Sequence, residues 1–379
     1  MKKQMIFIVL FMLIFFNTAY ANEHIEGILN SKAYENLNNL SNQSENINKV
    51  YENFSFLDFV KNITDAKNVF DAKSVLSKIG KIFFGQIHKN IPVLITLIVL
   101  SILSMLIENI NSSFNSKSTS EIAFFAFYLL YTGILSAGFF SCYESAKKVI
   151  GEQSAFMQAA TPTYISMLVM TGNVATGSVI KPLFLYFIST VTVIIEKILL
   201  PLTVMIFIMS TVNNLSKKVE ITRLINLLSL AVKKTLLIMT TLFIAMISLA
   251  KLSSMAIDGF GIRMAKYAVG NFVPVVGGIL TGTLDTVLSS FVILKNALGC
   301  AMVVVIALIC AHPVIEFIAL IFIYKLASGI VEVFGEKRVS DALFFASESI
   351  SLIFTMILCI SIMFILGTAI LIQFAKGSV

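Results

Sequence analysis

The feature that most constrains this chain is a series of apolar runs close to the length of a membrane crossing. The first begins near residue 91, and the longest uninterrupted run covers residues 350–372. A hydrocarbon core about 30 Å thick requires roughly 20 apolar residues of helix to cross it. Because lipid offers the backbone no hydrogen-bond partners, such runs cross as helices. The sequence therefore predicts an all-α, polytopic helical membrane protein.

The composition agrees with this class and weakens others. Hydrophobic residues make up 57% of the chain and charged residues only 13%, whereas soluble domains have about a quarter charged. The net charge of +7 is spread between apolar runs, which fits the positive-inside bias of membrane proteins better than nucleic-acid binding. The cysteines form no C-x-x-C pair, so we interpret them as buried apolar residues: Cys142, Cys300, Cys310 and Cys359.

The N-terminus has the pattern of a secretory signal over residues 1–21. Lys2 and Lys3 precede an apolar run, and Ala-Tyr-Ala at 19–21 forms a cleavage site. The alternative is an uncleaved anchor, and with either the next segment lies outside the cytoplasm. Residues 22–90 are polar with two stretches of helical periodicity. We expect a small extracytoplasmic helical region, serving as a partner surface or as a solvated connector.

Residues 91–379 form the predicted membrane domain, and its prolines suggest an internal repeat. Pro162 and Pro274 are separated by the same interval as Pro201 and Pro313. Duplicated halves are a common way for membrane carriers and channels to build a pathway. The alternative is that hydrophobic helices of similar length resemble one another. The predicted units are halves at 120–234 and 235–349, with a closing helix at 350–372.

The topology depends on whether the stretches after Pro162 and Pro274 cross the membrane or re-enter. Crossing gives about ten spans and parallel halves, whereas re-entry gives about eight spans and inverted halves. The connector at 213–234 is net positive and the one at 332–349 net negative, which favours opposite sides and inversion. The predicted location of the N-terminal region outside the cytoplasm favours crossing of these stretches over re-entry. The charged pair at 196–197 favours a short outside turn over a membrane-embedded ion pair.

A second constraint is the stretch at 270–295, which reads GNFVPVVGGILTGTLDTVLSSFVILK. Pro274 removes a backbone donor just before two glycines, and Asp285 places an acid among apolar residues. Broken backbone at membrane depth occurs where protein buries it or where it lines a wet cavity. The alternative is a small-residue face for helix packing. The candidate membrane-embedded polar or broken-helix residues are Pro162, Gly270, Asn271, Pro274, Gly277, Gly278, Asp285, Lys295, Glu316 and Lys325.

Motifs for catalysis or cofactor binding are missing from the sequence. It contains no G-x-x-x-x-G-K-[ST] loop, no H-E-x-x-H and no G-x-S-x-G. His312 with Glu316 one turn later is best interpreted as a helix start before Pro313. Asp285, Glu316 and Lys325 are expected to pair as structural ions before they line a path. We therefore predict no enzyme, no cofactor and no metal site.

Two segments carry a resemblance to a known family. They read GNFVPVVGG at 270–278 and LDTVLSSFVILKNALG at 284–299. Together with the signal, the polar N-terminal region and the many spans, the chain resembles the stage III sporulation protein AE family of endospore-forming bacteria. The resemblance covers nearly the whole chain after the signal and is densest at 159–299.

The resemblance implies a subunit of a channel or feeding complex between mother cell and forespore, needed for forespore development after engulfment. The subunit is made in the mother cell and inserted in the outer forespore membrane, and the complex meets a forespore-made partner across the intermembrane space. Other members supply the ATPase and the ring-forming parts. The family has no established catalytic residues to carry over.

Three functions remain open from the sequence. The first is a non-ATPase channel subunit, the second a self-contained secondary transporter, and the third an assembly scaffold. The expected partners are the other subunits of the complex, the lipid bilayer and further copies of the chain, without nucleic acid. The transported species and the stoichiometry are not encoded in any motif.

Overall fold

The computed structural model describes residues 32–51, 54–64, 72–113, 117–215, 221–272, 277–334 and 337–373. The predicted signal peptide lies outside the described residues. Every regular element in these ranges is a helix, which confirms the all-α prediction. The elements are α3 (Lys32–Gln43), α4 (Glu45–Val50), α5 (Phe56–Thr64), α6 (Ala72–Ser113), α7 (Lys117–Met170), α8 (Val174–Ile194), the π-helical turn η2 (Ile195–Leu199), α9 (Leu200–Leu215), α10 (Thr222–Phe272), α11 (Gly277–Val333) and α12 (Lys337–Gln373).

Six helical stretches within the described ranges are long and apolar enough to cross a membrane, which confirms the polytopic class. α8, η2 and α9 together form one continuous stretch, Val174–Asn214. The described residues thus contain six candidate spans, compared with the eight or ten considered for the whole chain. The reason is that several prolines and charged pairs that resemble boundaries lie inside continuous helices.

Pro162 is the first such position. The sequence predicts a break there, whereas α7 continues through it to Met170. The Ser166 hydroxyl donates to the Pro162 carbonyl at 2.9 Å, and the Thr161 hydroxyl donates to the Met157 carbonyl at 2.6 Å. These hydroxyls bond to carbonyls near that of Gln158, which Pro162 leaves without its helical donor.

The chain turns instead at Gly172, between α7 and α8. Gly172 has a φ of 87°, in the left-handed region that favours glycine. The amide of Asn173 donates to the Leu168 carbonyl at 3.2 Å, and the amide of Gly172 donates to the Val169 carbonyl at 2.9 Å. This pair of bonds is the Schellman arrangement that ends a helix.

The charged pair Glu196–Lys197 lies in η2, so the predicted outside turn at this position is wrong. The amide of Leu200 bonds to the carbonyl of Ile195, five residues earlier. Pro201 follows and lacks the donor that an ordinary helical turn needs. A local π-turn accommodates this loss without ending the helix. α11 likewise continues through Pro313, so the predicted helix start at His312 is also wrong.

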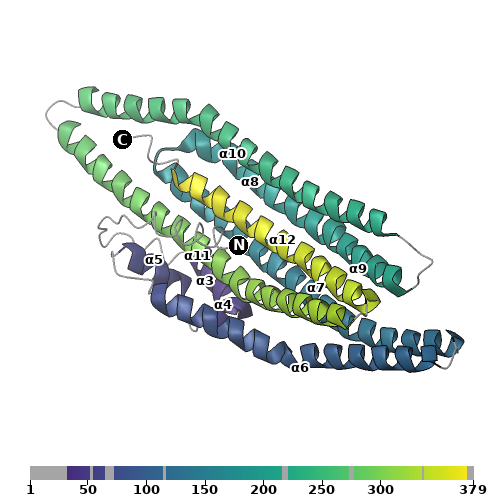
Figure 1. The fold of residues 1–379 in the computed structure, drawn as a ribbon. Coiled ribbons are helices and arrows are strands. Elements are labelled where there is room, and N and C mark those ends of the chain that lie inside the picture. The colour runs from purple at the N-terminus through teal and green to yellow at the C-terminus, as the bar shows by residue number, and fades with distance from the viewer. Residues whose placement is uncertain are drawn as a thin grey trace.

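The long helices form an elongated bundle in which successive helices run in opposite directions (Figure 1). The connections α6–α7, α9–α10 and α11–α12 lie at one end, and those of α7–α8 and α10–α11 at the other. The two connectors at 213–234 and 332–349 therefore share one end, and the opposite-side expectation from their charges is wrong. The internal repeat itself stays a prediction.

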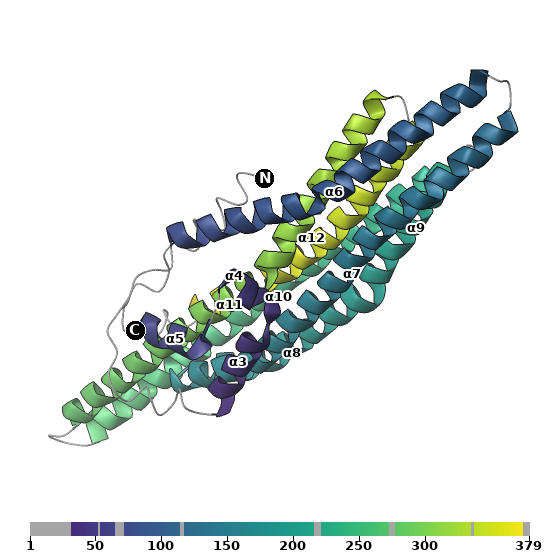
Figure 2. The same cartoon turned by 90° about the horizontal axis from the view of Figure 1, so that it is seen from below.

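The N-terminal helices lie along the side of the bundle (Figure 2), where they pack on α7 and α11. Phe56 of α5 meets Phe156 of α7 edge-on, with ring centroids 6.0 Å apart. Glu152 of α7 accepts hydrogen bonds from Ser44 Oγ at 2.8 Å and from Asn46 Nδ2 at 3.2 Å. This region is therefore a layer attached to the bundle. α6 begins at 72, inside the segment assigned to the extracytoplasmic region.

Close helix packing depends on Gly367 of α12. A Cβ at this position would lie 2.7 Å from ring carbons of both Phe184 and Phe243, on α8 and α10. We expect Gly367→Ala to lower the free energy of unfolding by about 1–3 kcal/mol, since two buried rings must shift. The measurement is the apparent melting temperature of the purified protein in detergent.

The matched control is Gly329→Ala in α11, where a Cβ would meet no atom within 4 Å. Alanine is the better helix former, so this variant should melt at or above the wild-type temperature. A Gly367→Ala protein that melts as high as the Gly329→Ala protein would contradict the close-packing interpretation.

Candidate functional site

The predicted site residues fall into two groups in the structure. The side chains of residues 250–287 lie outside the described part, so the structure does not place those of Asn271 and Asp285. The backbone of α10 includes Gly270 and Asn271, and α11 begins at Gly277 and Gly278. Pro274 lies outside the described residues. The described candidates are Pro162, inside α7, and three charged residues on α11: Lys295, Glu316 and Lys325.

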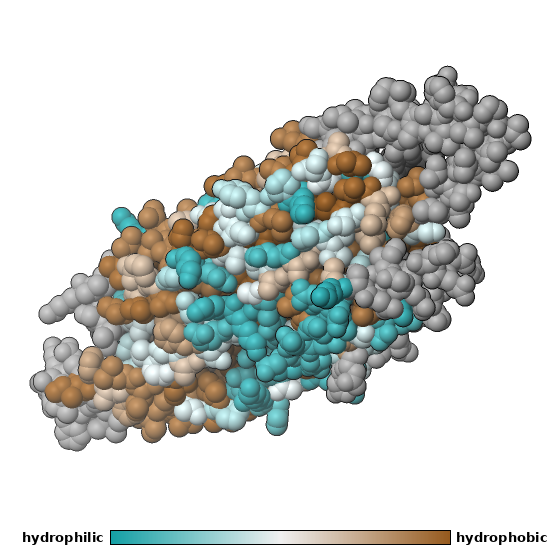
Figure 3. Space-filling view, turned by 180° about the vertical axis from the view of Figure 1, so that it is seen from behind, coloured by the Kyte–Doolittle hydropathy of each residue, from teal (hydrophilic) through white to brown (hydrophobic). Residues whose placement is uncertain are grey.

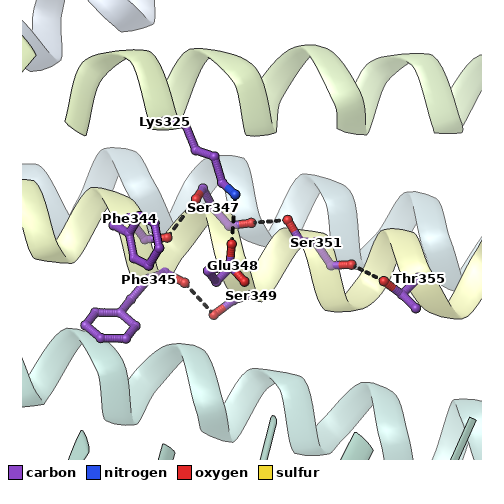
Figure 4. Close-up of polar contacts among 8 residues, drawn as sticks. All are labelled: Lys325, Phe344, Phe345, Ser347, Glu348, Ser349, Ser351 and Thr355. Carbon is purple, nitrogen blue, oxygen red and sulfur yellow. Dashed lines mark hydrogen bonds and ion pairs between the residues drawn. The ribbon is translucent and has the colours of Figure 1, made fainter. Parts of the chain in front are cut away.

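Lys325 forms an ion pair with Glu348 of α12 (Figure 4). Its Nζ lies 2.8 Å from Glu348 Oε1, and both side chains are about two-fifths exposed. The same ammonium lies 5.6 Å from the ring centroid of Phe344. The sequence analysis expected Lys325 to pair with Glu316 or Asp285, so the structure corrects this partner. Residues 325 and 348 lie at nearly equal sequence distances on either side of the turn between α11 and α12, so the antiparallel helices bring them together. This spacing is the sequence signal that could have identified the pair.

Hydroxyl groups surround this ion pair on α12. Ser347 donates to the Phe344 carbonyl at 2.7 Å, and Ser349 donates to the Phe345 carbonyl at 2.9 Å. Nearer the turn, Ser328 and Ser340 each donate to the other's carbonyl, at 3.0 Å and 2.9 Å. These bonds satisfy each hydroxyl locally and, at Ser328 and Ser340, fasten α11 to α12.

Lys295 has a different role from Lys325. It is fully buried, and its Nζ donates to the Ile372 carbonyl at 2.9 Å. Ile372 lies in the last turn of α12, where carbonyls lack an intrahelical donor. A cation is favourable at this end of a helix. Lys295 therefore caps the closing helix from α11, an arrangement that sequence spacing does not reveal.

Glu316 is half-buried and lies one turn after His312, which faces α6. His312 Nε2 is 3.4 Å from Gln86 Nε2, in a contact whose donor depends on the histidine tautomer. The cations that act on Glu316 are Lys49 of α4 and Lys89 of α6. Glu316 thus faces the N-terminal layer and not the Lys325 pair.

The three charged candidates on α11 are therefore not brought together. Lys295, Glu316 and Lys325 each have their own surroundings, along more than half of α11. Among the described residues, no group of three or more His, Cys, Asp or Glu is close enough to hold a metal ion. The contacts of Lys295, Lys325 and Ser328 join α11 to α12, whereas those of Ser347 and Ser349 lie within α12. They offer positioning and assembly rather than an arrangement of nucleophile, acid and base.

A charge exchange tests the Lys325–Glu348 pair. Lys325→Glu places two carboxylates together, and we expect it to lower the free energy of unfolding by about 1 kcal/mol, because exposed pairs contribute little. Adding Glu348→Lys restores opposite charges and should recover most of that loss. The measurement is a double-mutant cycle of apparent melting temperatures. A double variant less stable than Lys325→Glu alone would show that the two positions are not paired.

Comparisons with known proteins agree with this architecture. The family model for stage III sporulation protein AE matches residues 54–375, which include α5 and all the long helices. The stage III sporulation protein AE of Bacillus subtilis (strain 168) is 29% identical over 303 residues, covering 80% of this chain and 76% of that protein. No solved structure matches the chain. Because one family model spans the bundle from end to end, the chain belongs to the stage III sporulation protein AE family.

Proposed function

We propose that this protein is a membrane-embedded, non-ATPase subunit of the channel complex between mother cell and forespore. Its family implies a role in sporulation. The finer role as a subunit, and not as a self-contained transporter, rests on the length of its apolar helices. These helices are longer than the hydrocarbon core of the bilayer is thick, and this observation carries the proposal.

The continuous helix from α8 through α9 illustrates this excess. It contains elements of 21, 5 and 16 residues, so it is about 63 Å long at 1.5 Å per residue. To stay within about 30 Å of hydrocarbon it would have to tilt by about 60°, beyond the usual range of 0–40°. Exposed apolar side chains occur along its whole length, from Val174 and Val179 to Ile208 and Val212.

The face drawn in Figure 3 also exposes apolar side chains over a wide area, with hydrophobic surface to the left of and above a central hydrophilic region. Lipid can cover only a band of such a surface, and large exposed apolar areas elsewhere mark contacts with other proteins. This favours a subunit whose remaining apolar faces are covered by other copies or other members of the complex.

The direction of the helices supports a specific topology. With the N-terminal helices outside the cytoplasm after signal cleavage, the α6–α7, α9–α10 and α11–α12 connections lie inside. The last two carry basic residues, as the positive-inside bias favours: Lys217, Lys218, Arg223, Lys337 and Arg338. In the outer forespore membrane, the N-terminal layer would then face the intermembrane space and a forespore-made partner.

Thiol labelling tests this topology. Val333 is 85% exposed at the α11–α12 end, and Val174 is 57% exposed at the opposite end. In growing cells that produce the protein in their cytoplasmic membrane, we expect Val174→Cys to react with a membrane-impermeant maleimide from outside, and Val333→Cys to react only after the cells are opened. A protein lacking its native cysteines is the control for background. The reverse labelling pattern would contradict the proposed orientation.

The function is tested by deleting the gene and following sporulation. We expect engulfed forespores to shrink and a late forespore-specific reporter to stay silent, because the forespore is no longer sustained by the channel. The measurements are forespore volume and reporter fluorescence, with the wild-type gene as the complementation control. Normal sporulation together with a nutrient or ion phenotype in growing cells would contradict the proposal and favour a self-contained transporter.

A further inference from the structure

A cavity of about 230 Å³ is lined by residues of α9, α10 and α12, which come together towards the end of the bundle where α9 connects to α10. Pockets that enclose a whole small molecule are usually about 300–1,000 Å³. This cavity therefore suits a compact polar group whose remainder extends outside it. Exposed residues form part of the lining, so the cavity opens to the surface.

One wall of the cavity consists of hydrogen-bond donors on α10. Asn226, Ser229 and Lys233 line it, and their spacing of three and four places them on one helical face. None of these side chains has a partner within the described part of the chain. Residues that carry an amide, a hydroxyl and an ammonium along one wall supply donors suited to an oxyanion such as phosphate.

The charge of the cavity also favours an anion. Glu348 contributes to the lining, but its carboxylate is held by Lys325 at 2.8 Å. Lys233 and Glu348 are the charged residues of the lining, and because Lys325, outside the lining, neutralises Glu348, Lys233 is left without a counter-charge there. The first turns of α10 add further basic residues, including Arg223 and Lys234.

The remaining walls are apolar. Ile206 of α9 and Phe345 and Leu352 of α12 line the cavity beside the polar wall. The adjoining surfaces of α9 and α10 expose Met205 and Leu230, in stretches apolar enough to cross a membrane. A ligand that matches both surfaces has an anionic head and hydrocarbon chains. Basic pockets between membrane helices commonly take such head groups.

We propose that this cavity is a binding site for the phosphate-bearing head group of an anionic phospholipid, with Lys233 as the principal charged contact. The acyl chains lie along the exposed apolar surface of α9 and α10. The site does not depend on the proposed channel function, since it concerns how the bundle is held in its bilayer.

Native mass spectrometry of the full-length purified protein tests the site. The probes are phosphatidylglycerol and phosphatidylcholine with identical acyl chains, each titrated separately, and inorganic phosphate as a soluble anion. We expect wild-type protein to retain phosphatidylglycerol in preference to phosphatidylcholine. Lys233→Gln should weaken phosphatidylglycerol binding about fivefold, the equivalent of about 1 kcal/mol for one lysine near the membrane surface.

The matched control is Lys234→Gln, which removes the neighbouring charge but does not line the cavity. It should retain most of the lipid preference. A melting curve of each variant establishes that it is folded, and both lysines are exposed, so the fold should persist. Ser229→Ala, which removes one neutral donor, should weaken binding less than Lys233→Gln.

Three outcomes would overturn the proposal. Equal binding of the two lipids would show that the head-group charge is not recognised. Equal losses in Lys233→Gln and Lys234→Gln would indicate general surface charge in place of a defined cavity. Displacement of phosphatidylglycerol by inorganic phosphate at matched concentration would assign the cavity to a soluble anion and not to lipid.

Discussion

The structure depends on satisfying backbone hydrogen bonds within helices, because lipid supplies no partner for them. This requirement explains how long helices persist through residues that interrupt them. Near Pro162, side-chain hydroxyls bond to neighbouring carbonyls, and before Pro201 a π-helical turn shifts the bonding pattern. Between α7 and α8 the chain turns where another device satisfies the last carbonyls, as Gly172 does in its left-handed conformation. Fewer and longer helices result.

α11 organises the bundle because most other helices pack against it. Its most extensive packing is with α12, and it also meets α6, α7 and the N-terminal helices. Three described charged residues on it have different neighbours. Lys295 caps the end of α12, Lys325 pairs with α12 near the turn, and Glu316 lies near Lys89 of α6 and Lys49 of α4. The charged side chains described on α11 therefore connect it to neighbouring helices.

Sequence patterns predicted the helical membrane class, but they predicted too many boundaries. A proline, a histidine before a proline or a Glu–Lys pair resembles a helix boundary when only local propensity is considered. Glu196–Lys197 and His312–Pro313 both proved to be inside helices. Local signals failed at these positions because the helix continues through them, at Glu196–Lys197 by way of a π-helical turn. The gap between Phe272 and Gly277, around Pro274, is where such a signal did coincide with a change of helix.

The amino-acid sequence by itself determined the all-α fold, the membrane environment and the family, since these depend on hydrophobic run length and on residues compared position by position. Only the tertiary structure decided which side chains meet. Glu348 was not recognised as the partner of Lys325, and nothing local connects Lys295 with the Ile372 carbonyl. The cavity beside Lys233 likewise exists only where three helices meet. The physical reason is that the register between antiparallel helices is set by side-chain packing along their whole length and by where each turn occurs.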